Sequence, residues 1–312
     1  MPAEGCTPPC TSFSLLRWSD RSCQSGYNVA EMKIGLSLGS GGARGYAHIG
    51  VLQVLERAGI KVDLINGSSI GAIVGGAYAL YHDSKRLVSL ATEVVSRAHV
   101  NYYSIFQHAQ PDRHPHLRDW LLSALCDFTA LRTSVFSHRT NRTALSYLFG
   151  EYRFSDTAIP FSAVAVDLIT GKPVVIREGR LRDGILPSIS IPGVFPPVEW
   201  DGMLLTDGGV LADVPVRELR AEGAEFVIAV RLAGEPPAPY KNGFDLLTTV
   251  DYLKGKRLSD WEVEMADFLI EIELPGYDPM RFDDSRTAIE RGIRTAEAAL
   301  PGLLRKLEER DA

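Results

Sequence analysis

The chain has 312 residues, with 33 basic and 39 acidic side chains and a formal net charge of −6. Hydrophobic residues make up 45% and charged residues 23%, proportions of a soluble globular protein that exclude a disordered or collagen-like chain. The acidic balance argues against nucleic acid as the main partner, and no apolar run of about 18 residues predicts a transmembrane helix. The length fits one large domain or two unequal ones.

The cysteines and histidines are unevenly placed. Three of the four cysteines lie within the first 23 residues, and the last of the seven histidines is His138. Cysteines in this arrangement fit neither a disulfide framework nor a zinc site, so we expect no metal and no other cofactor. A reducing, cytoplasmic location follows as the default expectation.

Residues 1–31 differ from the remainder of the chain. They are rich in Ser, Cys, Pro and Gly, show no sustained periodicity, and lack the charged start and apolar stretch of a signal peptide. We therefore expect a poorly ordered extension, followed by one catalytic domain over residues 32–312.

From residue 33 onward, short apolar runs alternate with helical stretches. A strand at 33–38 leads into a glycine loop, a helix at 46–58, a second strand at 62–65 and a helix at 70–80. This order predicts an α/β fold, a single domain with a largely parallel central sheet flanked by helices.

The remaining elements fit the same fold with one addition. Residues 84–150 predict a helical insertion, broken by a polar loop at 108–116. Further predicted elements are strands at 161–168, 173–176, 225–232 and 268–272, and a last helix at 286–309, interrupted at Pro301.

The glycine loop at 39–45, between a strand and a helix, has three interpretations. Its bare N–H groups can face an anion beside a helix N-terminus, which fits a dinucleotide pyrophosphate or the oxyanion of an acyl-transfer intermediate. The third is a tight turn without a ligand. The spacing misses GxGxxG, and Asp63 stands near the start of the second strand rather than at its end, so the nucleotide interpretation is weak.

The pentapeptide GSSIG at 67–71 has the form GxSxG, with Ser69 at its centre. A strand precedes it and a helix follows, as in a nucleophile elbow, where small residues such as Gly67 and Gly71 let the backbone close. The alternative is an ordinary helix start after a strand. Ser68, the neighbouring serine, lacks flanking glycines on both sides.

A serine nucleophile needs a base, and no histidine follows His138. The α/β-hydrolase order along the chain, a nucleophilic serine, then an acid, then a histidine, therefore does not fit this sequence. A carboxylate acting directly remains, and Asp207, at the end of a short strand and before two glycines, is the preferred candidate. Asp167 and Asp213 compete with it, and an Asp-Gly-Gly sequence also suits a simple turn.

Three motifs now stand in order: GLSLGSGGARGYAHIGVL at 35–52, GSSIGAIVGGAYAL at 67–80, and SISIPGVFPPV with LLTDGGVLADVPV between 188 and 216. Together they resemble the patatin-like phospholipase family, most of all its compact bacterial members, over about residues 33–275. The resemblance implies acyl-ester hydrolysis by a Ser–Asp dyad without a histidine, with Ser69 as nucleophile and Asp207 as base.

The same resemblance implies an oxyanion hole built from the N–H groups of Gly41, Gly42 and Ala43, in a loop that Arg44 steadies. Two positions depart from the family pattern. Ser40 replaces the first glycine of its commonest loop, and Asp213 stands where related proteins often carry Asn.

The implied substrates are acyl esters of phospholipids or lysophospholipids, with at least transient contact to a membrane surface. Apolar residues of the third motif line an acyl-chain site or belong to the core: Ile189, Ile191, Val194 and Phe195. Apolar residues of the insertion form a lid or pack on the sheet: Tyr102, Tyr103, Ile105, Phe106, Trp120, Leu121 and Leu122. The alternative function is a non-catalytic nucleotide- or anion-binding protein that uses the loop at 39–45.

Overall fold

The computed structural model describes residues 32–98, 134, 136–234 and 243–311. Three expectations lie outside these residues: the poorly ordered extension at 1–31, the polar loop at 108–116, and the lid or packing role of the apolar residues at 102–122. All of the described residues belong to the unit that begins at Met32.

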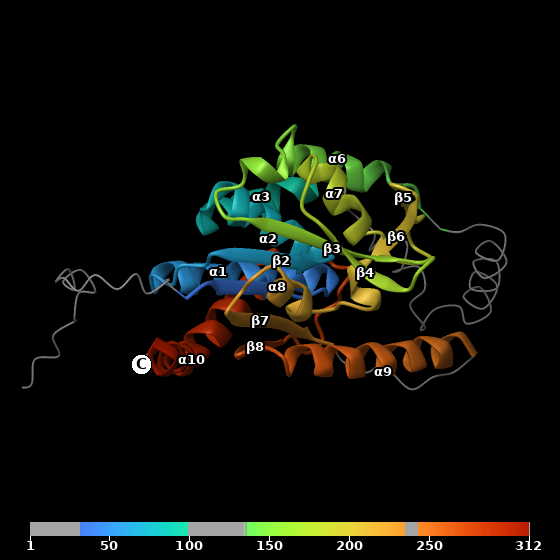
Figure 1. Cartoon of the computed structure of the whole chain (residues 1–312). Coiled ribbons are helices and arrows are strands. Elements are labelled where there is room, and N and C mark those ends of the chain that lie inside the picture. Colours follow the sequence, from blue (N-terminus) through green and yellow to red (C-terminus); the bar gives the residue numbers. More distant parts are fainter. Residues whose placement is uncertain (1–31, 99–133, 135, 235–242, 312) are drawn as a thin grey trace, which may run out of the picture. The chain divides into compact units, whose positions relative to one another are not determined.

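One eight-stranded sheet lies at the centre, in the order β5-β6-β3-β2-β1-β7-β8, with β4 paired to β3 (Figure 1). The neighbours β3-β2-β1-β7-β8 are all parallel, and β4, β5 and β6 join by antiparallel pairs. The strands are β1 (Ile34–Leu38), β2 (Leu64–Ser68), β3 (Phe161–Asp167), β4 (Lys172–Ile176), β5 (Val198–Trp200), β6 (Met203–Asp207), β7 (Phe226–Ala233) and β8 (Phe268–Glu273). The largely parallel sheet predicted from the sequence is confirmed.

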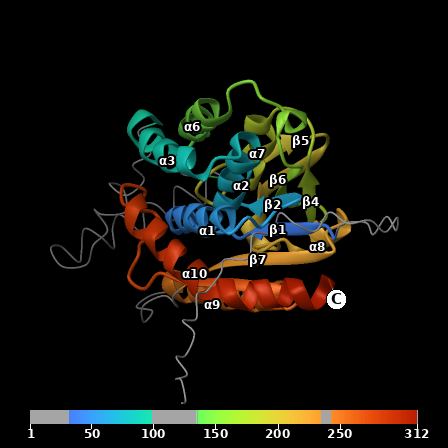
Figure 2. The same ribbon diagram turned by 90° about the vertical axis from the view of Figure 1, so that its left-hand side faces the viewer.

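Helices cover both faces of the sheet. They are α1 (Tyr46–Arg57), α2 (Ile70–Tyr81), α3 (Ser84–Ala98), α6 (Arg139–Phe149), α7 (Leu181–Ser188), α8 (Val216–Ala221), α9 (Gly243–Val263) and α10 (Ser285–Asp311). Three short 3₁₀ turns join them: η1 (Gly42–Gly45), η2 (Phe154–Asp156) and η3 (Gly208–Val210). The described parts of the insertion, α3 and α6, are helical and form an outer layer over α1, α2 and α7 (Figure 2).

The alternation of side chains along β7 explains the layering. Phe226, Ile228 and Val230 face the larger core, which contains the buried sides of α1, α2, α7 and α10. Val227 and Ala229 face a smaller core beneath α8 and the end of α9. Because a parallel strand is buried on both faces, β7 is apolar at nearly every position, which is what made it recognisable in the sequence.

Two expected boundaries are wrong. The second strand was expected at 62–65 but runs from Leu64 to Ser68, because the small residues at its end pair with Leu38 on one side and Val164 on the other. The last helix was expected to break at Pro301 but continues through it. Pro301 lies on the exposed side, where water can hydrogen-bond to the carbonyl that the proline leaves free, while the opposite side stays packed across the proline, from Ala296 to Leu303.

The strand order brings the last residues of two strands, β2 and β6, together. Along β3, residues Phe161 to Val164 pair with β2, and Ala165 to Asp167 pair with β6. Since β4 spans 163–167 of β3 on the other edge, β2 and β6 share one edge of β3 and meet there head to head. The last residues of these two strands, Ser68 and Asp207, are therefore neighbours on the same edge.

No helix in the described part of the chain is long and apolar enough to cross a membrane.

Candidate active site

Ser69 occupies the sharp turn between β2 and α2. Its backbone angles are φ 53° and ψ −122°, a strained conformation for a residue with a side chain. The turn closes tightly: a Cβ on Gly67 would lie 2.3 Å from the carbonyl carbon of Gly71, and a Cβ on Gly71 would lie 2.1 Å from the carbonyl oxygen of Leu38. Only glycine fits at either position, which accounts for the GxSxG spacing.

Asp207 lies beside Ser69. The Ser69 hydroxyl donates to Oδ2 of Asp207 at 2.7 Å, and the Gly209 N–H donates to Oδ1 at 2.8 Å. Both side chains are nearly enclosed, with exposed fractions of 8% for Ser69 and 5% for Asp207. The structure therefore places the serine and carboxylate selected from the sequence in direct contact.

The two competing carboxylates have other partners. Asp167 accepts hydrogen bonds from the Thr170 hydroxyl at 2.7 Å and from the Leu204 N–H at 3.2 Å, which holds the turn between β3 and β4. Asp213 accepts from the hydroxyls of Ser40 and Ser259. In the described structure neither carboxylate is hydrogen-bonded to Ser69.

The environment of Asp207 changes its protonation. Burial raises the pKa of this carboxyl to about 7, against the lowering effect of the hydrogen bonds from Ser69 and Gly209, and the nearby charge of Asp213 raises it further. The carboxylate is thus a stronger base than an exposed aspartate, and about half of it is ionised near pH 7.

The glycine loop lies between β1 and α1. Gly41 and Gly42 have φ of 147° and 59°, so only glycine adopts these conformations readily. Among the described residues the N–H groups of these two glycines have no hydrogen-bond acceptor, whereas the Ala43 N–H donates to the Pro279 carbonyl at 2.7 Å. Arg44 donates to the Ala233 carbonyl at 3.2 Å and so ties the loop to the end of β7.

One further contact fixes this loop, and another decides whether it can serve as a nucleotide site. His48 is fully buried beneath it and its Nε2 donates to the Gly39 carbonyl at 2.8 Å, while burial lowers the pKa of the imidazole to about 4, so this side chain is neutral at pH 7. Asp63 precedes β2 and accepts from the Ile34 N–H at 3.0 Å, at the opposite end of the strands from the loop. The carboxylate that a dinucleotide ribose would need at the end of β2 is absent from the described residues.

Two serines of the SISIPG motif, for which the sequence predicted no role, hold the backbone of Ser69 and Asp207 in place. The Ser188 hydroxyl accepts from the Ser69 N–H at 3.0 Å and donates to the Val164 carbonyl at 2.6 Å. The Ser190 carbonyl accepts from the Asp207 N–H at 3.0 Å. The signal was present, because two serines flanking a buried isoleucine are unusual in an otherwise apolar run, but their partners could not be assigned without the fold.

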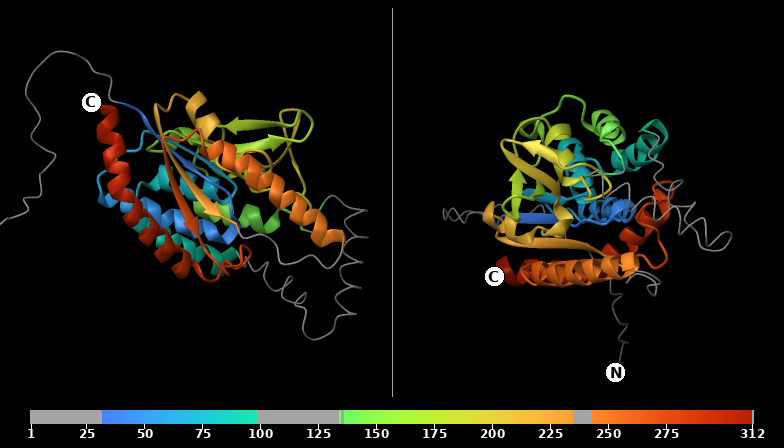
Figure 3. Two further views of the ribbon diagram at one scale, coloured as in Figure 1. Left: turned by 90° about the horizontal axis from the view of Figure 1, so that it is seen from below. Right: turned by 90° about the vertical axis from the view of Figure 1, so that its right-hand side faces the viewer.

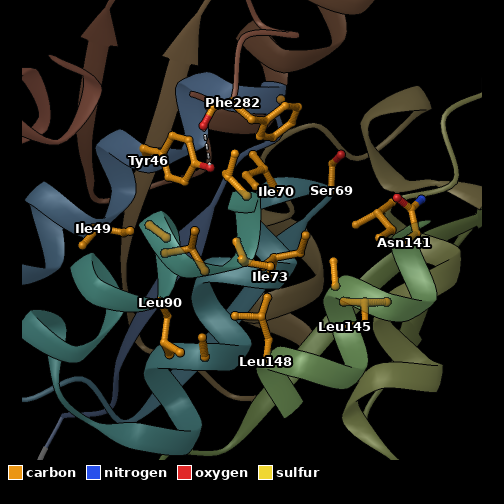
Figure 4. Close-up of a pocket in the computed structure, with 18 of the residues that line it drawn as sticks. Tyr46, Ile49, Ser69, Ile70, Ile73, Leu90, Asn141, Leu145, Leu148 and Phe282 are labelled. Carbon is orange, nitrogen blue, oxygen red and sulfur yellow. Dashed lines mark hydrogen bonds between the residues drawn. The ribbon is translucent and has the colours of Figure 1, made fainter. Parts of the chain in front are cut away.

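An apolar cavity of about 140 Å³ opens next to Ser69 and extends between α2, α3 and α6 (Figure 4). Three of the four residues predicted for an acyl-chain site line it, Ile189, Ile191 and Phe195, whereas Val194 does not. The other lining residues are mainly aliphatic: Gly42, Tyr46, Ile49, Ile70, Ile73, Val74, Ala77, Leu87, Leu90, Ala91, Val94, Val95, Asn141, Ala144, Leu145, Leu148, Met280 and Phe282. Among the lining residues that the structure describes, Ser69 carries the hydroxyl that is hydrogen-bonded to Asp207.

The described part of the chain contains no group of three or more His, Cys, Asp or Glu side chains that could hold a metal ion. The polar groups around Ser69 are hydroxyls, one carboxylate and backbone amides. These can transfer a proton and stabilise an anion, and they suit nucleophilic chemistry.

Residues 36–220, more than half of the chain, match the family model of the patatin-like phospholipases. The protein belongs to that family. The matched range contains the glycine loop, the elbow and Asp207, and it ends inside α8. The family membership predicted from the three motifs is therefore confirmed.

Several patatin-like relatives are similar over part of their length. An uncharacterised NTE family protein of Mycobacterium tuberculosis is 35% identical over 210 residues, 67% of this chain and 52% of that protein. Human patatin-like phospholipase domain-containing protein 6 is 31% identical over 241 residues, 73% of this chain and 15% of that protein. Lysophospholipase NTE1 of the yeast Scheffersomyces stipitis is 31% identical over 197 residues, 63% and 11% of the two chains.

This chain thus spans about half the length, or less, of the curated relatives it matches. Among solved structures, VipD from Legionella pneumophila is similar with a TM-score of 0.47 at 15% identity, covering 87% of this chain and 67% of that one.

Proposed function

We propose that this patatin-like protein is a serine acyl hydrolase that cleaves fatty-acyl esters of phospholipids or lysophospholipids, with Ser69 as nucleophile and Asp207 as base. The observation that carries the proposal is the 2.7 Å hydrogen bond from the Ser69 hydroxyl to Asp207, on a strained turn at the mouth of an apolar cavity. The names of two relatives, a phospholipase domain protein and a lysophospholipase, support lipid esters as the substrate class.

In the first step the Ser69 oxygen attacks the ester carbonyl while its proton passes to Asp207. The carboxylate already accepts this proton in a hydrogen bond, so no rearrangement of the base is needed. When the tetrahedral intermediate collapses, Asp207 returns the proton to the departing alcohol, and the acyl group stays on Ser69. In the second step a water molecule loses a proton to Asp207, attacks the acyl-enzyme and releases the fatty acid.

The negative charge of each tetrahedral intermediate needs donors that are already in position. We assign this role to the N–H groups of Gly41 and Gly42, which lack a protein acceptor among the described residues. The Ala43 N–H joins them only after its hydrogen bond to Pro279 breaks. The Arg44 guanidinium holds the loop through its hydrogen bond to the Ala233 carbonyl and does not act on the oxyanion itself.

The cavity suits the acyl chain of such an ester. Its wall along α2 runs from Ser69 to Ala77, a length of roughly 12 Å at 1.5 Å per residue. An extended hydrocarbon chain zigzags, so its C–C bonds of about 1.5 Å advance it by about 1.25 Å per carbon, and this length holds about ten carbons. The lining offers almost no polar group beyond the serine end, so the ester and headgroup remain at the mouth while the hydrocarbon is buried.

The direct test is hydrolysis of esters graded by chain length and headgroup, including phosphatidylcholine and lysophosphatidylcholine. Ser69→Ala and Asp207→Asn are each expected to reduce turnover by about 10³-fold or more, because each removes a member of the proton-transfer pair. Asp213→Asn is the matched control, since its carboxylate binds Ser40 and Ser259 instead. If Asp207→Asn keeps near-native turnover of an activated ester while Asp213→Asn loses it, the assignment of the base is wrong.

A further inference from the structure

The outer side of α9 carries an unusual amount of exposed apolar surface. Of the ten large hydrophobic side chains that are exposed in the described part of the chain, five lie on this one helix. They are Leu246, Leu247, Val250, Leu253 and Trp261. Single exposed leucines are common on soluble proteins, but five on one 21-residue helix are a patch, and patches of this kind mark binding surfaces.

The spacing places these residues on one side of the helix. Leu246, Val250 and Leu253 follow at intervals of four and three residues, and Trp261 lies eight residues further on, so they form a single stripe. The opposite side of α9 faces the protein, where Ser259 is buried and donates to Asp213. The stripe therefore points away from the sheet.

Two basic side chains lie along the stripe. Lys254 and Arg257 lie among the apolar residues, and the Arg257 guanidinium sits 4.9 Å from the centre of the Trp261 ring. Neither cation takes part in an ion pair with any residue that the structure describes. Two acidic residues lie beside the stripe: Asp260 is paired with Arg231 and Lys256, and the exposed Asp251 lies at its edge. In a chain whose net charge is −6, an apolar stripe that carries these two cations fits a partner that is apolar inside and anionic at its surface.

The position of α9 relates the stripe to the active site. The Tyr252 hydroxyl donates to the carbonyl of Gly234, directly after the end of β7. Because α9 runs back between two parallel strands, the helix before Tyr252 extends roughly 13 Å past the end of β7, at 1.5 Å per residue (Figures 1 and 3). The elbow at Ser69 and the glycine loop lie at this same edge of the sheet.

We propose that the exposed stripe of α9 binds the surface of an anionic lipid membrane and thereby brings the edge of the sheet that carries Ser69 to its substrate. The proposal rests on the proposed lipid substrate, and it names the surface by which the enzyme reaches it. Leu246, Leu247, Val250 and Leu253 enter the boundary between headgroups and acyl chains, while Lys254 and Arg257 contact lipid phosphates. Trp261 lies at the interface, where the tryptophan ring is favoured.

The test is vesicle binding by the full chain in a Ser69→Ala background, so that the lipids stay intact. Vesicles contain equal parts of phosphatidylglycerol and phosphatidylcholine, or phosphatidylcholine alone. The double variant Leu247→Glu/Leu253→Glu is expected to raise the lipid concentration for half-maximal binding at least about tenfold, since two exposed leucines are replaced by anions. Leu304→Glu, at a leucine that is 41% exposed on α10, is the matched control and is expected to bind as before.

A second pair, Lys254→Gln/Arg257→Gln, separates the electrostatic contribution. It is expected to weaken binding to the phosphatidylglycerol vesicles about thirtyfold, at roughly 1 kcal/mol for each of the two cations near an anionic surface, and to leave binding to phosphatidylcholine unchanged. Turnover of a soluble short-chain ester, measured in the same variants with Ser69 intact, is expected to stay at the wild-type value, which shows that the site is folded.

Three results would overturn the proposal. The Leu247→Glu/Leu253→Glu protein could bind vesicles as well as its parent, or the parent could fail to bind vesicles at all. Sedimentation could also show a dimer that this substitution dissociates while vesicle binding persists, which would make the stripe an interface between two copies. Vesicle binding with no turnover of any ester would instead refute the proposed function and leave the surface assignment standing.

Discussion

Replacing Asp207 by Asn should stabilise the fold while abolishing turnover. Asn has the same shape, keeps an oxygen for the Gly209 N–H, and offers an N–H to the Ser69 hydroxyl, so both hydrogen bonds of Asp207 have a counterpart. What the substitution removes is a charge that burial disfavours, since burial raises the pKa of this carboxyl from 3.8 to about 7.

The size of the effect follows from that pKa difference. The folded protein binds the Asp207 proton more tightly than the unfolded chain does, so the free energy of unfolding falls as the pH rises from about 4 to about 7. At 1.36 kcal/mol per pKa unit, the loss is about 2 kcal/mol at pH 5 and about 4 kcal/mol at pH 8. Asn does not titrate, so the free energy of unfolding of Asp207→Asn, relative to the wild type, rises by about 2 kcal/mol between pH 5 and pH 8.

Urea unfolding of both proteins at intervals between pH 5 and pH 8, followed by circular dichroism, gives this difference directly. Glu262, whose pKa burial raises to about 8, titrates over the same range in both proteins, so the difference curve isolates Asp207. Asp167→Asn serves as the control of opposite sign, because hydrogen bonds hold the pKa of Asp167 below its usual value and its loss is expected to destabilise the fold. An advantage for Asp207→Asn that is the same at pH 5 and pH 8, or an Asn variant less stable at pH 8, would refute the reasoning.

Three other predictions follow from the same contacts. Ser188→Ala is expected to lower kcat about tenfold or more at an unchanged KM, because it leaves the N–H of Ser69 unpaired. Ser190→Ala is the control and is expected to keep kcat, because the Ser190 hydroxyl bonds only within its own turn; an equal loss of kcat in both variants would exclude a positioning role for Ser188. The kcat/KM profile is expected to rise with pH through about 7 as Asp207 ionises, and Asp213→Asn should move this limb to lower pH; a limb that stays in place would exclude the coupling. Ala77→Leu, at the inner end of the cavity, is expected to reduce turnover of a sixteen-carbon ester relative to a four-carbon ester by about tenfold or more, and an unchanged ratio would place the acyl chain elsewhere.

The sequence was informative where one residue type alone satisfies a local requirement. Glycines at 67 and 71 marked the elbow because any Cβ there would meet backbone. Runs such as β7, apolar on both faces, marked buried parallel strands. The absence of histidines after His138 narrowed the choice of base to a carboxylate. Each inference needed only the chemistry of one segment.

The contacts that the sequence does not predict depend on distant segments. Asp207 was selected over Asp213, but the pairing that places it beside Ser69, with β2 and β6 on one edge of β3, is encoded in no local pattern. The role of Ser188 required α7 to end beside the elbow. The helix through Pro301 survives because its buried side spans the proline, and a local rule for proline takes no account of that packing.

Covalent labelling decides whether Ser69 is a nucleophile that is activated without a histidine. The protein is treated with a fluorophosphonate, digested, and mapped by mass spectrometry. We expect one phosphonylated peptide with the adduct on Ser69, which is lost in Ser69→Ala and forms much more slowly in Asp207→Asn. An adduct on another serine that persists in Ser69→Ala, or no adduct on a folded wild-type protein, would contradict it.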